Sequence, residues 1–218
     1  MTAAGVHQWA PAPAARPGND WLRLAWLYLI SRRTPSALAL LAGFGALLWA
    51  ALFWHWTVAG GAAAQQVVSL IVEAGAAAVI AVSTYGAFGE PERATGRWLP
   101  YLRLGASVAL TVAAAGALAA GSTGGAMPEG LSATFRNVAG ITGVGLLSAA
   151  VLGGLLAWAG PIAYLVLTET MLSGGRSSPW VWPTRPPHDP GAALCAAGVF
   201  AAGAVLISLR GAREPVRD

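Results

Sequence analysis

The strongest constraint on this chain is a series of apolar stretches between residues 36 and 209, each about as long as a membrane-spanning helix. A helix needs about 20 apolar residues to cross a hydrocarbon layer of about 30 Å. Charged residues make up only 10% of the chain, whereas a soluble domain carries about 25% to cover its surface. Because so few charges cannot hide this apolar surface from water, the sequence excludes a soluble enzyme. It predicts an all-α, polytopic membrane helix bundle.

The cysteine count and the kind of positive charge exclude two further classes. A single cysteine, Cys195, cannot build a disulfide scaffold. The positive charge comes from arginine alone and forms no stripe on a polar face, so we expect no nucleic-acid partner. A lysine-free chain rich in alanine, glycine and arginine is typical of a GC-rich bacterial genome. We therefore expect the protein in the bacterial cell membrane.

The apolar stretches divide into six predicted spans within a membrane domain of residues 21–210, with a flexible cytoplasmic tail at 1–20 and another cytoplasmic tail at 211–218. Residues 139–172 form one apolar stretch that is too long for one span and short for two. The pair Gly153–Gly154 and Pro161 favour a tight turn, so six spans are predicted rather than five. The predicted spans are residues 36–56, 65–87, 101–120, 131–153, 155–172 and 191–209.

A short apolar segment, Trp21–Arg33, precedes the first span. It is too short to cross the membrane, but its tryptophans suit the headgroup level. Its arginines, which include Arg23 and Arg32, suit anionic lipid. We therefore predict an amphipathic helix that lies in the plane of the interface.

The arginines predict how the spans are oriented, because cytoplasmic loops carry an excess of positive charge. With six spans and a cytoplasmic N-terminus, ten of the 13 arginines fall on the cytoplasmic side. With five spans the excess nearly disappears. The charge distribution thus favours six spans with both termini in the cytoplasm.

The predicted cytoplasmic loop between the second and third spans, residues 88–100, concentrates charge. It holds Glu90, Glu92, Arg93 and Arg97, and Pro91 is suited to the first turn of a helix. A short charged helix here could dock on a soluble partner, where charge pairs fix the register. The alternative is a solvated connection whose arginines only enforce the topology.

Residues 173–191, here called the Pro/Trp segment, connect the fifth and sixth predicted spans on the outer side. Five prolines exclude a regular helix or a paired strand. Trp180 and Trp182 would rest at the interface or fold back towards the mouth of a pathway. This segment could form an outer cap that touches substrate, or a passive lid.

Two ionisable residues, Glu73 and Glu169, lie inside predicted spans, and Arg136 lies near the start of the fourth span at a similar depth. A charge at the centre of a span costs about 2.5–3.5 kcal/mol on insertion scales, so such residues usually face the interior of a bundle. We expect Arg136 to pair with Glu73 or Glu169. The three residues are then either part of a pathway or a clamp between helices.

The sequence contains no motif for catalysis or metal binding. Its three histidines are not spaced as ligands, and the lysine of a phosphate-binding loop is missing. There is no nucleophile elbow and no zincin motif. We therefore expect neither an enzyme nor a bound metal.

The order of these elements resembles the permease subunit of the ATP-binding-cassette exporters of the second type. In that family an amphipathic helix precedes the first span, a charged coupling helix follows the second, and a re-entrant outer segment lies between the fifth and sixth. The run Glu90-Pro-Glu-Arg-Ala-Thr-Gly-Arg-Trp-Leu-Pro100 is similar to the family's acidic and basic run. The resemblance covers about residues 20–210.

The resemblance implies that this chain forms half of a translocation pathway, as a homodimer or with a second permease. A cytoplasmic ATPase subunit would bind ATP and magnesium, so this chain itself would hold no cofactor. Glu90, Glu92, Arg93, Arg97, Arg23 and Arg32 would couple the two subunits. The alternatives are a membrane scaffold or assembly protein that transports nothing, and a secondary transporter that uses Glu73 and Glu169.

Overall fold

A computed structural model of the chain describes residues 30, 34–54, 61–84, 99–125, 130–175, 178 and 180–210. Within these ranges the regular structure is helical and no strand occurs. The predicted interfacial helix, apart from Ile30, and most of the charged loop lie outside the described residues. Six helices are long and apolar enough to cross a membrane, which confirms the predicted all-α bundle of six spans. The chain is built as a multi-pass membrane protein.

In the described part of the chain, three short 3₁₀ turns accompany the six long helices. One turn, η3 (Ser122–Gly124), extends α5; η4 (Gly154–Leu156) precedes α7; and η5 (Trp182–Thr184) lies between α7 and α8. The helices are α2 (Thr34–Phe53), α3 (Gly61–Ser83), α5 (Leu99–Gly121), α6 (Gly130–Leu152), α7 (Ala159–Ser173) and α8 (Pro190–Arg210).

The division of the long apolar stretch at Gly153 is confirmed. Helix α6 ends at Leu152, and Gly153 has φ 95°, a conformation that costs little only in glycine. The chain then makes the η4 turn and enters α7. Two helices therefore occupy residues 130–173.

The second predicted span falls within helix α3. Helix α3 runs from Gly61 to Ser83, and its part that is apolar enough to cross a membrane, Gln65–Ser83, begins at the predicted residue 65 and ends four residues before the predicted residue 87. At its end, the hydroxyl groups of Ser83 and Thr84 donate to the carbonyls of Ile80 and Ala81. Side-chain hydroxyls thus satisfy carbonyls that have no partner in the last turn of a helix, and a hydropathy pattern does not show this.

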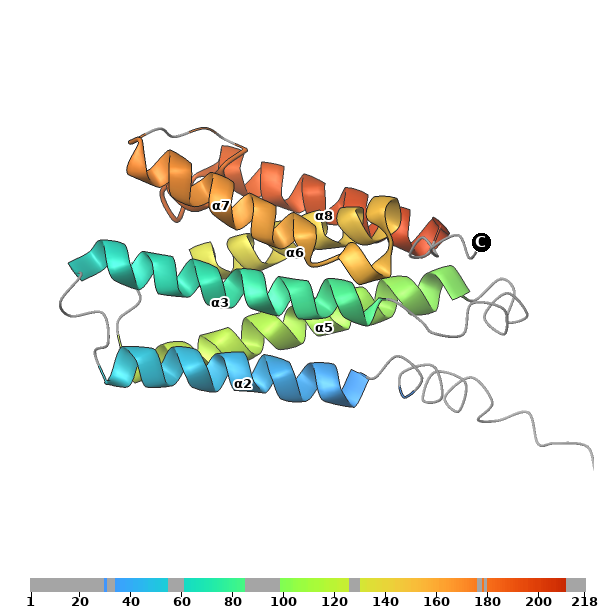
Figure 1. The fold of residues 1–218 in the computed structure, drawn as a ribbon, viewed down its shortest axis with the longest axis horizontal. Helices are drawn as coiled ribbons and strands as arrows, with labels where there is room; N and C mark the ends of the chain where they lie inside the picture. The colour runs from blue at the N-terminus through green and yellow to red at the C-terminus, as the bar shows by residue number, and fades with distance from the viewer. Residues whose placement is uncertain are drawn as a thin grey trace, which may run out of the picture.

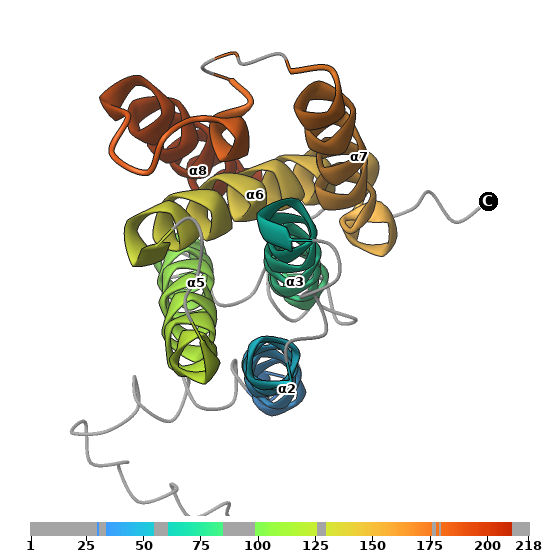
Figure 2. The ribbon, with the colours of Figure 1, turned by 90° about the vertical axis from the view of Figure 1, so that its left-hand side faces the viewer.

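Helix α6 lies at the centre of the bundle. Seen end-on, it passes between α7 and α8 on one side and α2, α3 and α5 on the other (Figures 1 and 2). It contacts α3, α5, α7 and α8, and its buried residues accordingly point in several directions. A side chain on α6 can therefore reach most of the other elements.

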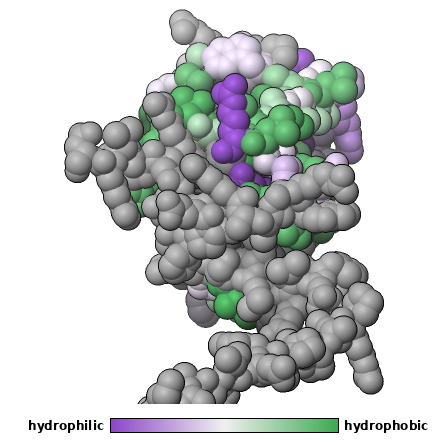
Figure 3. Space-filling model, turned by 90° about the vertical axis from the view of Figure 1, so that its right-hand side faces the viewer, coloured by the Kyte–Doolittle hydropathy of each residue, from purple (hydrophilic) through white to green (hydrophobic). Residues whose placement is uncertain are grey.

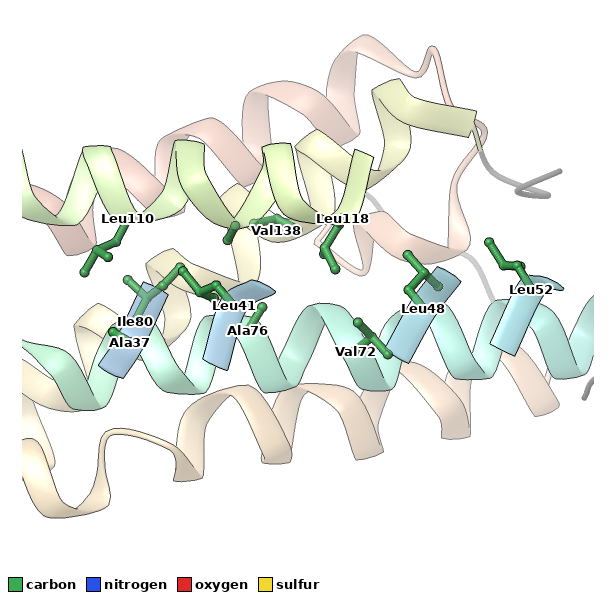
Figure 4. Packing of buried hydrophobic residues seen from close by; sticks show 11 residues of the cluster. Ala37, Leu41, Leu48, Leu52, Val72, Ala76, Ile80, Leu110, Leu118 and Val138 are labelled. Atoms are coloured by element: carbon green, nitrogen blue, oxygen red, sulfur yellow. The ribbon is translucent and has the colours of Figure 1, made fainter. Parts of the chain in front are cut away.

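Three apolar clusters fill the spaces between the helices. The first joins α2, α3 and α5 to Val138 of α6, through residues that include Leu41, Leu48 and Leu118 (Figure 4). The second gathers around Trp182, and the third joins α6 and α8 to Ala81 of α3 and to Ala157. In a lipid bilayer, van der Waals packing of these side chains holds the helices together.

Large apolar side chains also cover the outside of the helices. Those at Leu40, Val112, Leu155, Val166 and Leu194 are all more than half exposed. Such an outer surface is unfavourable in water and favourable in hydrocarbon. At the end of the bundle opposite to that in Figure 2, by contrast, the coloured surface mixes hydrophobic and hydrophilic residues (Figure 3).

Candidate functional site

Several hydrogen bonds between distant parts of the chain meet at the junction between α6 and the Pro/Trp segment. Arg136 lies in the second turn of α6 and is only 7% exposed. Its guanidinium donates from Nη1 to the carbonyl of Pro186 at 2.7 Å and from Nη2 to the carbonyl of Arg185 at 3.2 Å. Its Nε donates to Oδ1 of Asn137 at 3.4 Å. A buried guanidinium thus ties α6 to the segment.

The prolines explain why these two carbonyls need an external donor. Arg185 and Pro186 each precede a proline, so neither of the two peptide groups carries an N–H. The chain therefore cannot continue through them as a helix or as a paired strand. The carbonyl of Pro186 also accepts from the backbone N–H of Asp189, and the guanidinium supplies the remaining donors.

Trp182 is the apolar anchor of the same segment. It is 2% exposed and stacks on Tyr164 of α7, with the ring centres 4.6 Å apart. Its indole also lies against Gly140 of α6, where a Cβ atom would approach the ring to 2.5 Å. Only glycine at position 140 leaves room for the indole in this position.

Two further hydrogen bonds reach the backbone of the segment from other helices. The hydroxyl of Tyr164 in α7 donates to the carbonyl of Trp180 at 3.1 Å. Nε2 of Gln66 in α3 donates to the carbonyl of Pro183 at 3.4 Å. The segment therefore has polar contacts with α3, α6 and α7.

The end of the segment forms the start of α8. The carboxylate of Asp189 accepts from the backbone N–H groups of Gly191 and Ala192 at 2.8 and 3.2 Å. It also pairs with the guanidinium of Arg185, whose Nε lies 2.6 Å away. The hydrogen bond from Ala192, followed by the one from Arg185, lowers the pKa of Asp189 below its usual range. Asp189 thus caps the helix and fixes the position of Arg185.

The two predicted intramembrane glutamates lie in different surroundings. Glu73 of α3 is 1% exposed, and it shares a helix face with Gln66 and Ser69 because they are seven and four residues apart. Glu169 of α7 is half-buried, and its Oε1 accepts no hydrogen bond from the described residues. The pairing of Arg136 with either glutamate stays a prediction.

The structure brings together some of the predicted site residues. Arg136 and Trp182 meet at the Pro/Trp segment, which runs from α7 to α8 across one end of the bundle (Figure 2). Trp180, by contrast, is 48% exposed. The six predicted coupling residues lie outside the described part of the chain.

Four residues of the junction were not predicted from the sequence: Gln66, Gly140, Tyr164 and Asp189. Asp189 could have been found, because aspartate directly before a proline is typical of the first turn of a helix. The other three carry no local signal. In the described ranges, no three His, Cys, Asp or Glu side chains gather where they could hold a metal.

Comparison of the chain with protein-family models, curated proteins and solved structures finds no significant match in any of the three.

Proposed function

We propose that this chain is the membrane subunit of an ATP-driven exporter of the second type and forms half of its translocation pathway. The observation that carries the proposal is the order of elements. Two spans, α2 and α3, precede the charged loop; α5, α6 and α7 follow it; and the Pro/Trp segment, in which Val181 and Trp182 are buried, separates α7 from α8. The exporter family that the chain resembles is expected to have the same order of elements.

The proposed energy source is a separate ATPase subunit. The sequence contains no G-x-x-x-x-G-K-[ST] phosphate-binding loop, which favours a partner subunit as the site of ATP binding. In this proposal ATP and magnesium bind to a separate ATPase subunit, and the chain is not an enzyme. A second copy of the chain or a second permease completes the pathway in the lipid bilayer.

The expected contacts with the ATPase come from one end of the bundle. Helices α2 and α5 begin at this end, and α3 and α8 finish there (Figure 1). The sequence that precedes α2 carries Arg23 and Arg32, and the sequence between α3 and α5 carries Glu90, Glu92, Arg93 and Arg97. By the excess of arginine we assign this end to the cytoplasm of a bacterial cell.

Copurification tests the proposal. The tagged chain, extracted from its native membrane in mild detergent, is expected to retain a subunit with magnesium-dependent ATPase activity. Reversal of two charges in E90R/E92R is expected to lower the recovered activity at least about tenfold, because charge pairs at an interface set partner choice. The matched control is E214R/D218R, which changes the net charge equally in the C-terminal tail. It is expected to retain the ATPase.

Two results would contradict the exporter proposal. If no variant recovers an ATPase, the scaffold alternative is favoured. If E90R/E92R retains the ATPase as well as the control does, the charged loop is not the coupling element.

A secondary transporter is the second candidate, and the burial of Glu73 within α3 favours it. Proteoliposomes with an internal pH dye would test for proton flux. In a proton-coupled carrier, E73Q is expected to abolish flux that the parent shows, whereas an exporter permease without ATPase shows none in either form.

A further inference from the structure

The Pro/Trp segment is attached to the bundle differently from any helix. The helices hold one another through apolar clusters and close glycine contacts. The segment combines a short apolar anchor, the buried Val181 and Trp182, with hydrogen bonds from the helices to its own carbonyls. Its polar ties can therefore break while the contacts between the helices stay intact.

Arg136 makes the strongest of these ties. Gln66 and Tyr164 are neutral donors, and each makes one bond. Arg136 is charged and makes two bonds to consecutive carbonyls, and hydrogen bonds from a charged group are roughly twice as strong as neutral ones. Two carbonyls at this spacing also suit the planar fork of arginine, whereas lysine offers a single point charge.

Residues 180–190 of the segment are suited to move as a unit. Prolines at 183, 186, 187 and 190 restrict its backbone. Trp180 and His188 are already exposed, whereas Val181 and Trp182 between them are buried. Movement of this part of the segment away from α6 would uncover Val181 and Trp182, so exposure at position 181 reports it.

We propose that Arg136 is a latch: its guanidinium holds the Pro/Trp segment against α6, and release of its two hydrogen bonds opens the segment while the helices stay folded. Arg136 is thus a positioning residue, and the planar, two-donor geometry of its guanidinium matters as well as its charge. This inference concerns the chain alone and does not rest on the exporter proposal.

Labelling with a maleimide tests the latch on the full chain in detergent, where both ends of the bundle are accessible. The background is Cys195→Ala, and the reporter is Val181→Cys, at a position that is 0% exposed. His188→Cys, at an exposed position, reports the intrinsic rate. Thr142→Cys, which is 0% exposed within α6, reports unfolding of the helices.

R136Q and R136K are each expected to raise the labelling rate at position 181 about tenfold, the effect of losing a hydrogen bond to a charged group. Labelling at positions 142 and 188 is expected to stay unchanged. The control R103Q removes an arginine of α5 and is expected to leave position 181 protected. If R136Q fails to fold, R136K decides the question, because it keeps the buried charge.

Three results would overturn the latch. Protection of position 181 in R136K equal to that of the parent would show that charge alone suffices. Equal acceleration at positions 142 and 181 would show that Arg136 supports the whole fold. Rapid labelling of position 181 in the parent would show that the segment is not held closed.

Discussion

In two pairs of helices, α2 with α5 and α6 with α8, a glycine lies directly against the backbone of the other helix, and only the second pair carries a polar junction. In α2 and α5, a Cβ on Gly45 would lie 2.5 Å from the carbonyl oxygen of Ala117, and one on Gly121 would collide with the carbonyl of Gly45. In α6 and α8, a Cβ on Gly203 would lie 2.5 Å from the carbonyl oxygen of Gly143. Both pairs use the close backbone approach that small residues allow in membranes.

The difference lies in what surrounds each pair. The α2–α5 contact is flanked by an apolar cluster, and the hydroxyls of Ser107 and Thr111 bond within α5 itself. The α6–α8 pair is joined at one end by the Pro/Trp segment, with its guanidinium and its capping carboxylate. Non-helical backbone at membrane depth must find donors elsewhere in the protein. The comparison teaches that glycine sets the spacing of both pairs, whereas polar groups occur where the backbone leaves the helix.

The largest expected effect is the loss of stability caused by a methyl group added at either glycine contact. In G143A the new Cβ would lie 2.6 Å from the backbone of Phe200, which cannot move aside alone. We expect a loss of about 3 kcal/mol in folding free energy, at the upper end for overpacking, and a similar loss for G45A. Denaturation in detergent measures both. The matched control is G198A, whose Cβ would meet nothing within 4 Å.

If G143A left the folding free energy unchanged while G45A lowered it, the two helix pairs would not depend on glycine in the same way. This result would mean that the polar junction, rather than the glycine contact, sets the spacing of α6 and α8.

A smaller loss is expected from G140A, which acts on the segment rather than on a helix pair. The new Cβ would lie 2.5 Å from the indole of Trp182, a side chain that can shift. We expect a loss of about 2 kcal/mol, measured by the same denaturation. The double variant G140A/W182F should recover part of it, because the smaller ring leaves space for the methyl group. Additive losses in the double variant would show that the two residues do not compete for the same space.

The sequence was sufficient to predict the six long helices but only part of the junction. Apolar length and the Gly153 turn are local signals, so the six spans followed from them. Trp180 and Trp182 are two residues apart in one segment, yet one is 48% and the other 2% exposed. Their difference depends on Gly140 and Tyr164, which are distant in sequence and reach the indole only after α6 and α7 have packed.

Loss of one hydrogen bond at the junction is expected to have a still smaller effect. Y164F removes the donor to the carbonyl of Trp180, and we expect a loss of about 1 kcal/mol. The control T111V removes a buried hydroxyl of α5 that bonds within its own helix. It is expected to change stability by less than about 0.5 kcal/mol, because such bonds add little to a helix that is already hydrogen-bonded. Equal losses of folding free energy in Y164F and T111V would show that the hydrogen bonds at the junction stabilise the protein no more than those within α5.

The smallest effect, and the only one that depends on pH, is expected at Asp189. Its pKa is held below the usual range by the N–H of Ala192 and by Arg185, so its stabilisation is present at neutral pH and is lost as the pH falls through the folded pKa. In D189N the amide can still cap α8 but no longer pairs with Arg185. The thermal midpoint of D189N should therefore lie below that of the parent at pH 7, and the gap should narrow below about pH 4. The control D218N, in the C-terminal tail, should show no gap at either pH. A gap of constant size would mean that the amide and the carboxylate differ only in shape, and that the charge of Asp189 does not stabilise the start of α8.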